Sequence, residues 1–120
     1  MIQTFIKILT ENTALVENTD LFYLEIPLGK TGVWFSDRQT DSKFNGTGYK
    51  EFDIYYRGKT KSSLITNIEY LKTTLDELHT ETCELSDGTT FSLKLLYQWD
   101  FLGKDSEGYY VFANSCGLLV

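Results

Sequence analysis

The feature that most constrains the fold is one long helical pattern near the middle of the chain. Between Ser63 and His79 the apolar residues recur mostly at intervals of three or four, so they fall on one stripe of an α-helix. The stripe consists of Leu64, Ile65, Ile68, Leu71, Leu75 and Leu78. Polar and charged residues cover the other face, and Ser62 or Ser63 is placed to cap the free N–H groups at its start. The pattern predicts a long amphipathic helix that needs a packing partner.

Shorter segments with alternating apolar and polar residues, typical of β-strands, flank this helix. They lie at Leu21–Pro27, Val33–Phe35, Tyr49–Arg57, Phe91–Asp100 and Tyr109–Ser115. A short N-terminal helix is also predicted by the spacing of Ile2, Phe5, Ile6 and Leu9. Strands and helices do not alternate regularly, so we expect the α+β class, with a mainly antiparallel sheet packed against both helices. The 120 residues are expected to form a single domain, 1–120.

The chain is acidic, with a formal net charge of −6 and a pI near 4.7. Such a chain repels the phosphate backbone of nucleic acids unless its basic residues cluster. The densest basic group is Arg57, Lys59 and Lys61, which is small and more typical of a solvated turn. Direct binding of nucleic acid is therefore not expected.

Neither a disulfide nor a membrane segment is expected. Cys83 and Cys116 have no Cys-x-x-Cys spacing, and the apolar start of the chain is interrupted at Lys7, unlike a signal peptide. No apolar run approaches the roughly 20 residues that a membrane-spanning helix needs. We expect a cytosolic protein without membrane contact, whose reduced cysteines act as packing residues.

A Gly-Lys-Thr triplet occurs twice, at residues 58–60 and 29–31, and suggests a phosphate-binding loop. That loop also requires a glycine five residues before the triplet, because its backbone must turn its N–H groups toward the phosphates. Asp53 and Leu24 stand at the two corresponding positions, and both lie in predicted strands. Nucleotide binding is therefore not expected, and the triplets are interpreted as turns.

The remaining residues do not make a catalytic or metal-binding pattern. His79 is the only histidine, and Cys83 lies four residues beyond it, but catalytic pairs usually meet through the fold rather than along the chain. A zinc site needs about four ligands, more than these residues supply. We predict no catalytic residues, no metal, no cofactor and no enzyme activity. An enzyme that uses a Gly-Lys-Thr turn or the His79–Cys83 pair is kept as a less favoured hypothesis.

Two segments are candidates for contacts with other proteins. The apolar residues Leu118, Leu119 and Val120 either pack against the domain's own helix, the more common arrangement, or form a subunit interface. The polar stretch from Ser36 to Gly48 is predicted to be a mobile loop. Its charged residues are either simply solvated or become ordered on docking; they are Asp37, Arg38, Asp41 and Lys43.

The order of these elements resembles one protein family. The segments LFYLEIP, GVWFSD and GTGYKEFDIYYRGKTKSS precede the leucine-striped helix, and LKLLYQWDFLGKDSEGYYVFANSCGLLV follows it. This order is similar to that of the tail-terminator, or minor capsid (head–tail joining), proteins of long non-contractile-tailed bacteriophages, particularly those that infect Gram-positive bacteria. The likeness covers most of the chain and rests on architecture rather than on a signature motif. The opening helix is shorter than the family leads us to expect.

The resemblance implies a structural virion protein with no catalytic residues to carry over. Subunits of that family assemble into an oligomeric ring, generally a hexamer, that caps the head-proximal end of the tail tube during viral tail assembly. The implied partners are other copies of the chain, the tail-tube protein and the head connector or stopper protein, while genome DNA passes through the lumen without specific binding. The implied location is the tail or neck of the virion, and the host cytoplasm during assembly. The alternative is a small acidic cytosolic binding protein of the immunity or inhibitor type, without catalysis.

Overall fold

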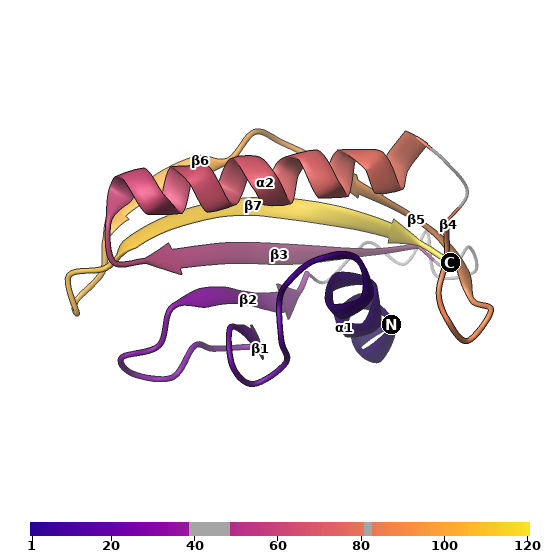
Figure 1. Ribbon diagram of the computed structural model, residues 1–120, viewed down its shortest axis with the longest axis horizontal. Coiled ribbons are helices and arrows are strands. Elements are labelled where there is room, and N and C mark those ends of the chain that lie inside the picture. Colours follow the sequence, from indigo (N-terminus) through magenta and orange to yellow (C-terminus); the bar gives the residue numbers. More distant parts are fainter. Residues whose placement is uncertain (39–48, 81–82) are drawn as a thin grey trace.

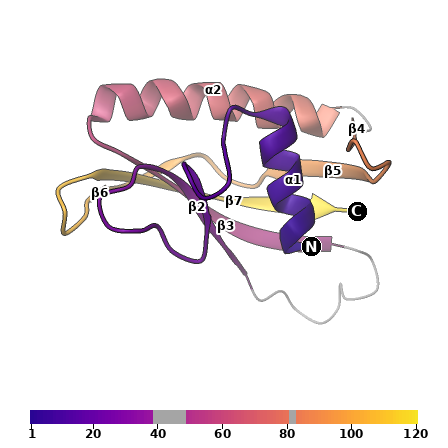
Figure 2. The same cartoon turned by 60° about the horizontal axis from the view of Figure 1, so that its bottom comes forward.

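The computed structural model describes residues 1–38, 49–80 and 83–120. Two helices, α1 (Ile2–Asn12) and α2 (Lys61–Thr80), lie on the same face of a curled sheet (Figures 1 and 2). The sheet has seven strands, and among the described residues all strand pairings but one are antiparallel. The predicted α+β class with a mainly antiparallel sheet is therefore confirmed.

The strands follow the order β1-β2-β3-β7-β5-β4 across the sheet, and β6 also pairs with β7, beyond the end of β5. Their bounds are β1 Leu21–Tyr23, β2 Gly32–Asp37, β3 Tyr49–Gly58, β4 Cys83–Glu84, β5 Thr90–Leu95, β6 Asp100–Lys104 and β7 Tyr110–Leu119. The ten-residue strands β3 and β7 pair along their whole length. These two strands form the centre of the sheet, and the shorter strands flank them.

Helix α2 confirms the predicted central helix. It starts two residues earlier than predicted because Thr60, rather than Ser62 or Ser63, is its cap: the Thr60 hydroxyl accepts a hydrogen bond from the Ser63 N–H at 3.3 Å. The predicted stripe is buried apart from Ile65; the buried members are Leu64, Ile68, Leu71, Leu75 and Leu78. The helix packs mainly over β5 and β3.

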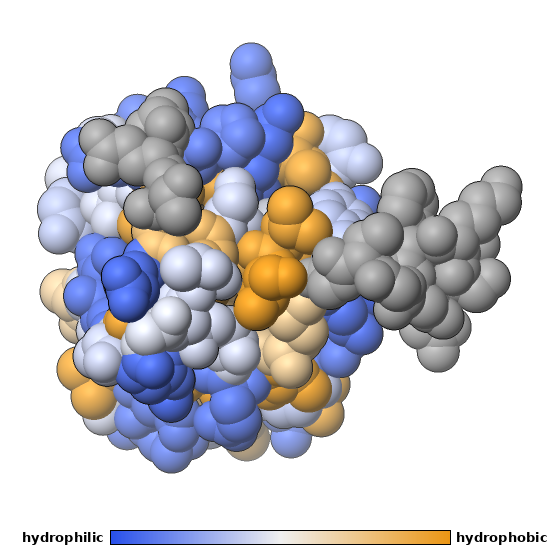
Figure 3. Space-filling model, turned by 90° about the vertical axis from the view of Figure 1, so that its right-hand side faces the viewer, coloured by the Kyte–Doolittle hydropathy of each residue, from blue (hydrophilic) through white to orange (hydrophobic). Residues whose placement is uncertain are grey.

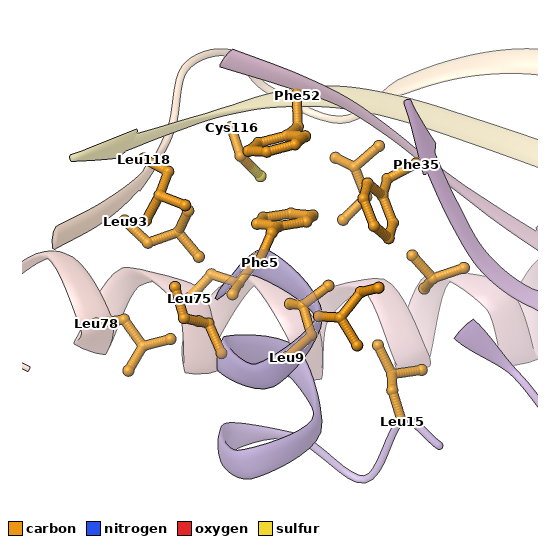
Figure 4. Packing of buried hydrophobic residues seen from close by; sticks show 14 of the residues in the cluster. Phe5, Leu9, Leu15, Phe35, Phe52, Leu75, Leu78, Leu93, Cys116 and Leu118 are labelled. Carbon is orange, nitrogen blue, oxygen red and sulfur yellow. The ribbon is translucent and has the colours of Figure 1, made fainter. Parts of the chain in front are cut away.

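Helix α1 confirms the predicted N-terminal helix and carries the central residue of the core. The ring of Phe5 stacks on that of Phe52, 4.4 Å away between centroids, and meets the edge of the Phe35 ring at 4.8 Å. Figure 4 shows Phe5 between Phe52 of the sheet and Leu75 of α2. Burial of a side chain of this size contributes about 1.5–3 kcal/mol. Packing, rather than helix length, therefore holds α1 in place.

The first predicted strand is wrong beyond Tyr23. Leu24 has a φ of +74°, a left-handed backbone conformation that ends β1, whereas the sequence pattern extends the strand to Pro27. The chain then crosses over, so that β1 runs parallel to β2. Gly32, with a φ of +129°, lies so close to Asp20 that a Cβ atom would be 2.3 Å from its carbonyl oxygen. Only glycine permits this approach.

The predicted strand Phe91–Asp100 is in fact two strands. β5 ends at Leu95, β6 begins at Asp100, and residues 96–99 leave the regular ladder between them. The Asn114 side chain replaces part of the missing pairing, because its Oδ1 accepts from the Tyr97 N–H (3.3 Å) and its Nδ2 donates to the Tyr97 carbonyl oxygen (3.0 Å). The alternation of apolar residues in the sequence continues through residues 96–99. The pattern alone therefore does not show that β5 ends at Leu95.

The predicted loop Ser36–Gly48 begins later than expected. Ser36 and Asp37 are the last residues of β2 and pair with Asp53 and Phe52 of β3. Pairing with a neighbouring strand here outweighs the local turn-forming tendency of these polar residues. Residues 39–48 lie outside the described part of the chain.

Candidate functional site

One face of the sheet is covered by no helix of the described chain. Successive side chains of a strand point to opposite faces, and the buried residues Val33, Phe35, Phe52 and Ile54 point toward the helices. The residues between them point to the other face, which we call the open face. Its central residues are Trp34 of β2, Asp53, Tyr55 and Arg57 of β3, and Val111, Ala113 and Ser115 of β7. Two adjacent hollows lie on the open face.

The first hollow, which we call the apolar hollow, has a volume of about 400 Å³. Trp34 and Tyr55 line it, and their rings are stacked 4.9 Å apart between centroids. Two leucines in its lining are strongly exposed, Leu28 at 86% and Leu102 at 55%. Large apolar side chains left exposed around a concave surface are typical of interaction sites.

One guanidinium group holds the polar end of the apolar hollow together. Arg57 is buried and forms ion pairs with Asp105 (2.6 Å) and Glu107, both in the turn between β6 and β7. It also donates to the Lys30 carbonyl oxygen (3.2 Å) and lies over the Tyr109 ring, 4.2 Å from its centroid. These contacts, which we call the Arg57 clamp, tie β3 to two separate segments that line the hollow.

The electrostatics of the Arg57 clamp favour the charged forms of Arg57 and Asp105. Burial alone would lower the pKa of Arg57, but the hydrogen bonds and charges of Asp105 and Glu107 raise it above its ordinary value. Burial alone would raise the pKa of Asp105, but Arg57 and two backbone N–H groups of the turn hold it below its ordinary value. The ion pair between Arg57 and Asp105 is therefore formed at neutral pH.

The second hollow, which we call the polar hollow, has a volume of about 640 Å³. It shares Tyr55 and Leu102 with the apolar hollow, so the two are neighbours on the open face. Arg38 lines it and pairs with Asp53 at 3.0 Å and, less closely, with Glu51 at 3.4 Å. The charge of Arg38 is thus already offset by carboxylates of β3.

The lining of the polar hollow carries a net negative charge. Arg38 also donates to Ser115 Oγ (3.2 Å), and the Ser115 hydroxyl donates to Asp53 (3.0 Å). A hydrogen bond to the Tyr97 side chain and the neighbouring carboxylates raise the pKa of Arg38 above its ordinary value, against the opposing effect of burial. Asp53 and Asp100 line the hollow against the one cation Arg38, so the described lining carries a net charge of −1.

The structure separates the predicted contact residues Asp37 and Arg38. Asp37 accepts a hydrogen bond from the Tyr23 hydroxyl (2.9 Å) and pairs with Lys50 (3.3 Å). Arg38 instead belongs to the polar hollow. The other two predicted residues of this stretch lie outside the described part of the chain; they are Asp41 and Lys43.

The apolar residues at the end of β7 divide between the core and the surface. Leu118 is fully buried in the core, so its side chain is not available to another subunit. Leu119 and Val120 are exposed, at 47% and 48%, and Met1 lies at the same end of the molecule (Figure 1). Figure 3 looks onto this end and shows hydrophobic residues gathered at its centre. We call Met1, Leu119 and Val120 the terminal patch.

The residues that raised the nucleotide hypothesis have structural roles. Gly58 ends β3 and Thr60 caps α2, so this triplet forms a strand-to-helix turn. Asp53, at the position of the missing glycine, lies in the middle of β3. In the described part of the chain, no group of three His, Cys, Asp or Glu residues is placed to hold a metal ion. No helix there has the length and apolar character needed to cross a membrane.

Neither cysteine is in a disulfide within the described part of the chain. Cys116 is fully buried in the core, and burial raises the pKa of its thiol to about 12. A thiol with so little thiolate form is unreactive. The Cys83 thiol donates a hydrogen bond to the Leu78 carbonyl oxygen (3.4 Å), at the junction between α2 and β4.

The sequence alone does not single out the residues that shape the open face. Trp34, Tyr55 and Arg57 come from predicted strands, but the strand pattern does not show that they share one surface. Leu28 and Leu102 lie outside the predicted strands altogether. The one usable signal is the alternation itself, which places Tyr55 and Arg57 on the face opposite the apolar residues of their strand.

No protein-family model matches the chain. No curated protein matches it significantly.

Proposed function

We propose that this chain is a structural virion protein, a tail-terminator or neck subunit that forms a ring at the head-proximal end of a phage tail tube and joins it to the head connector. The observation that carries the proposal is the open face, a sheet surface with two adjacent hollows and no described helix over it. A ring subunit must present surfaces of this kind, because each copy contacts its neighbours and other tail proteins. The resemblance in element order supports this particular kind of ring.

The chemistry of the apolar hollow supports a protein partner. Tyr and Trp are enriched in protein interfaces, where unpaired charges are costly. Trp34 and Tyr55 are stacked on each other, and the charge of Arg57 is offset within its clamp. The hollow thus offers rigid aromatic groups without an uncompensated buried charge, which suits a lasting contact.

The net charge supports passage of DNA through the ring. A wall that repels phosphates lets a nucleic acid slide, whereas a basic wall retains it. The chain carries a formal charge of −6, and the polar hollow is negative as well. In the proposed ring the genome passes without specific binding, and the tail-tube protein and the head connector or stopper bind on opposite sides.

The test is capping of tail tubes in vitro. The purified chain is added to the polymerising tail-tube protein of the same phage, and tube lengths are measured by electron microscopy. We expect shorter tubes with the added protein at one end. A length distribution identical to that of tubes grown alone would refute the proposal.

Two variants provide a matched pair for this assay. Trp34→Ala removes an aromatic group of the open face, and we expect it to impair capping. Tyr70→Ala removes an aromatic group that is exposed on α2, away from both hollows, and we expect normal capping. Circular dichroism establishes that both variants are folded.

A second candidate function is that of a small acidic binding protein of the immunity or inhibitor type. The polar hollow favours it, because a negative lining beside Tyr55 and Tyr97 suits a basic group of a target protein. Sedimentation separates the two candidates. A protein of this second type stays monomeric at high concentration and in the presence of tail-tube protein, whereas a ring subunit associates.

A further inference from the structure

We propose that residues 25–31 form a movable strap at the rim of the apolar hollow, and that the Arg57 clamp is the latch that holds this strap in place. The segment joins β1 to β2, and two of its residues, Ile26 and Leu28, line the hollow. Movement of the strap therefore changes the size of the hollow. That the hollow is a contact surface rests on the proposed function, whereas the movement rests on the geometry of the strap and the clamp.

The strap is joined to the rest of the molecule at few points. Within the described part of the chain, two hydrogen bonds connect residues 25–31 to other segments. The Gly29 N–H donates to Glu107 Oε2 (3.2 Å), and the Lys30 carbonyl oxygen accepts from Arg57 (3.2 Å). Both bonds end on members of the clamp, so the clamp alone holds the backbone of the strap. Figure 1 shows the strap as the purple loop at the lower left, at the same end of the molecule as the turn between β6 and β7.

Side-chain packing adds little to this attachment. Of residues 25–31 only Ile26 and Thr31 are partly buried, and the others are exposed. Leu28 is 86% exposed although it lines an apolar hollow. Segments with few buried apolar contacts open at a small cost in free energy. The strap can therefore move while the core stays folded.

The backbone on either side of the strap provides fixed points for this movement. Leu24 has a φ of +74°, a strained conformation for a leucine, and such strain is typical of switch segments and ligand clamps. Its N–H is held by the Phe35 carbonyl oxygen (2.7 Å). After the strap, Gly32 is held by its close approach to Asp20. Between these points the chain around Gly29 has room to reorient, because no atom lies within 4 Å of the position of its Cβ.

The tip of the strap forms a closed turn. The Lys30 N–H donates to the Pro27 carbonyl oxygen (3.2 Å), and Gly29 supplies the positive φ that a type II turn requires at its third residue. Leu28 lies in this turn, so the turn carries it as one unit. Breaking the two hydrogen bonds to the clamp is therefore enough to widen the hollow, and no strand pairing has to change.

The first experiment removes the latch of the strap but leaves the rest of the clamp. Glu107→Ala removes the acceptor of the Gly29 N–H, while Arg57 keeps its ion pair with Asp105. NMR relaxation of the backbone amides then measures the order of the strap in the intact chain. We expect the order parameters of residues 28–30 to fall from about 0.85 to below about 0.6, while those of β3 and β7 do not change. Glu107→Gln keeps an acceptor oxygen and is expected to keep most of the order.

Glu69→Ala is the matched control, because Glu69 is an exposed glutamate of α2 outside the lining of the hollow. Its strap should be as ordered as that of the wild type. If the strap of Glu107→Ala is as rigid as that of this control, the clamp is not a latch. If β3 and β7 lose as much order as the strap, the substitution loosens the whole sheet and the strap is not a separate moving part. Either result overturns the proposal.

The second experiment tests whether the wall of the hollow moves. Ile26→Cys places a thiol at a partly buried position of the strap, and Leu102→Cys places one in the lining that belongs to β6. Each thiol is modified with an excess of reagent, and the chain without the added cysteine accounts for Cys83 and Cys116. Addition of Glu107→Ala is expected to speed modification several-fold in Ile26→Cys and to leave the rate in Leu102→Cys unchanged. No change in either rate, or an equal rise in both, would contradict a moving strap.

Failure of the strap is distinguishable from failure of the proposed function. A rigid strap in Glu107→Ala, together with normal capping of tubes by the wild type, refutes the strap and leaves the terminator function standing. A mobile strap in Glu107→Ala, together with wild-type protein that has no effect on tube length, supports the strap and refutes the terminator function.

Discussion

The ring of Phe5 lies flat on that of Phe52, with centroids 4.4 Å apart and only 8° between the planes. Phe5 belongs to α1 and Phe52 to the central strand β3, and both side chains are fully buried. An isolated helix of 11 residues is marginal in water. This stack therefore anchors α1 to the sheet and closes the core on that side.

Phe5→Ala is expected to lower the free energy of unfolding by about 3–5 kcal/mol, because it leaves a cavity between Phe52 and α2. Urea denaturation followed by circular dichroism measures the change. Tyr70→Ala, at an exposed position of α2, is the control and should stay within about 0.5 kcal/mol of the wild type. A Phe5→Ala variant as stable as this control would mean that α1 contributes little to the core.

Arg57→Met keeps the apolar stem of the side chain but removes the guanidinium group that Asp105 and Glu107 face. The expected loss is about 2–3 kcal/mol, less than for a fully buried pair, because both carboxylates reach solvent. Lys61→Met is the control, since the Lys61 amine lies over the Phe101 ring at the surface, and it should cost less than about 1 kcal/mol. Similar urea midpoints for the two variants would show that the Arg57 clamp is not needed for stability.

The lowered pKa of Asp105 predicts a loss of stability in acid. Because the pKa is lower in the folded state, the ionised group contributes stability that is complete above its unfolded pKa of about 3.9 and is lost as pH falls toward the folded pKa. Below about pH 4 the free energy of unfolding should therefore fall more steeply for the wild type than for Arg57→Met, in which the pairing is already absent. Urea titrations across this range measure both slopes, and parallel curves would contradict the assignment.

Gly29, before β2, and Gly32, the first residue of β2, offer a matched comparison. Gly32→Ala would place its Cβ 2.3 Å from the Asp20 oxygen, so we expect it to cost about 3 kcal/mol or more and to increase hydrogen exchange in β1. Gly29→Ala meets no atom within 4 Å and bears only the strain of a φ of +74°, about 1–2 kcal/mol. Equal losses of stability would show that the close approach to Asp20 is not the constraint.

The long helices and strands could be predicted because each is specified by a pattern of apolar residues within its own segment of the sequence. The stripe from Leu64 to Leu78 specifies a helix by its period alone, and α2 extends the prediction by only a few residues. Strand β3, Tyr49–Gly58, matches the predicted Tyr49–Arg57 to within one residue. The same holds for α1, whose apolar residues occupy one face.

The rest could not be predicted because it depends on residues far apart in the chain. The break between β5 and β6 depends on Asn114, 17 residues from Tyr97, and the Arg57 clamp joins residues 50 positions apart. Tertiary packing also decides which of the predicted contact residues are accessible. Leu118 is in the core, whereas the next residue, Leu119, is exposed. The open face exists only because both helices pack on one side of the sheet, and no local pattern specifies that.

Strand β7 runs without interruption from the wall of the apolar hollow to the terminal patch. A strand rises about 3.3 Å per residue, so its ten residues hold these two surfaces roughly 30 Å apart. Pairing with β3 along its full length holds it within the curled sheet (Figure 1). The length of this strand therefore sets how far the Arg57 clamp lies from Leu119 at the other end of the sheet.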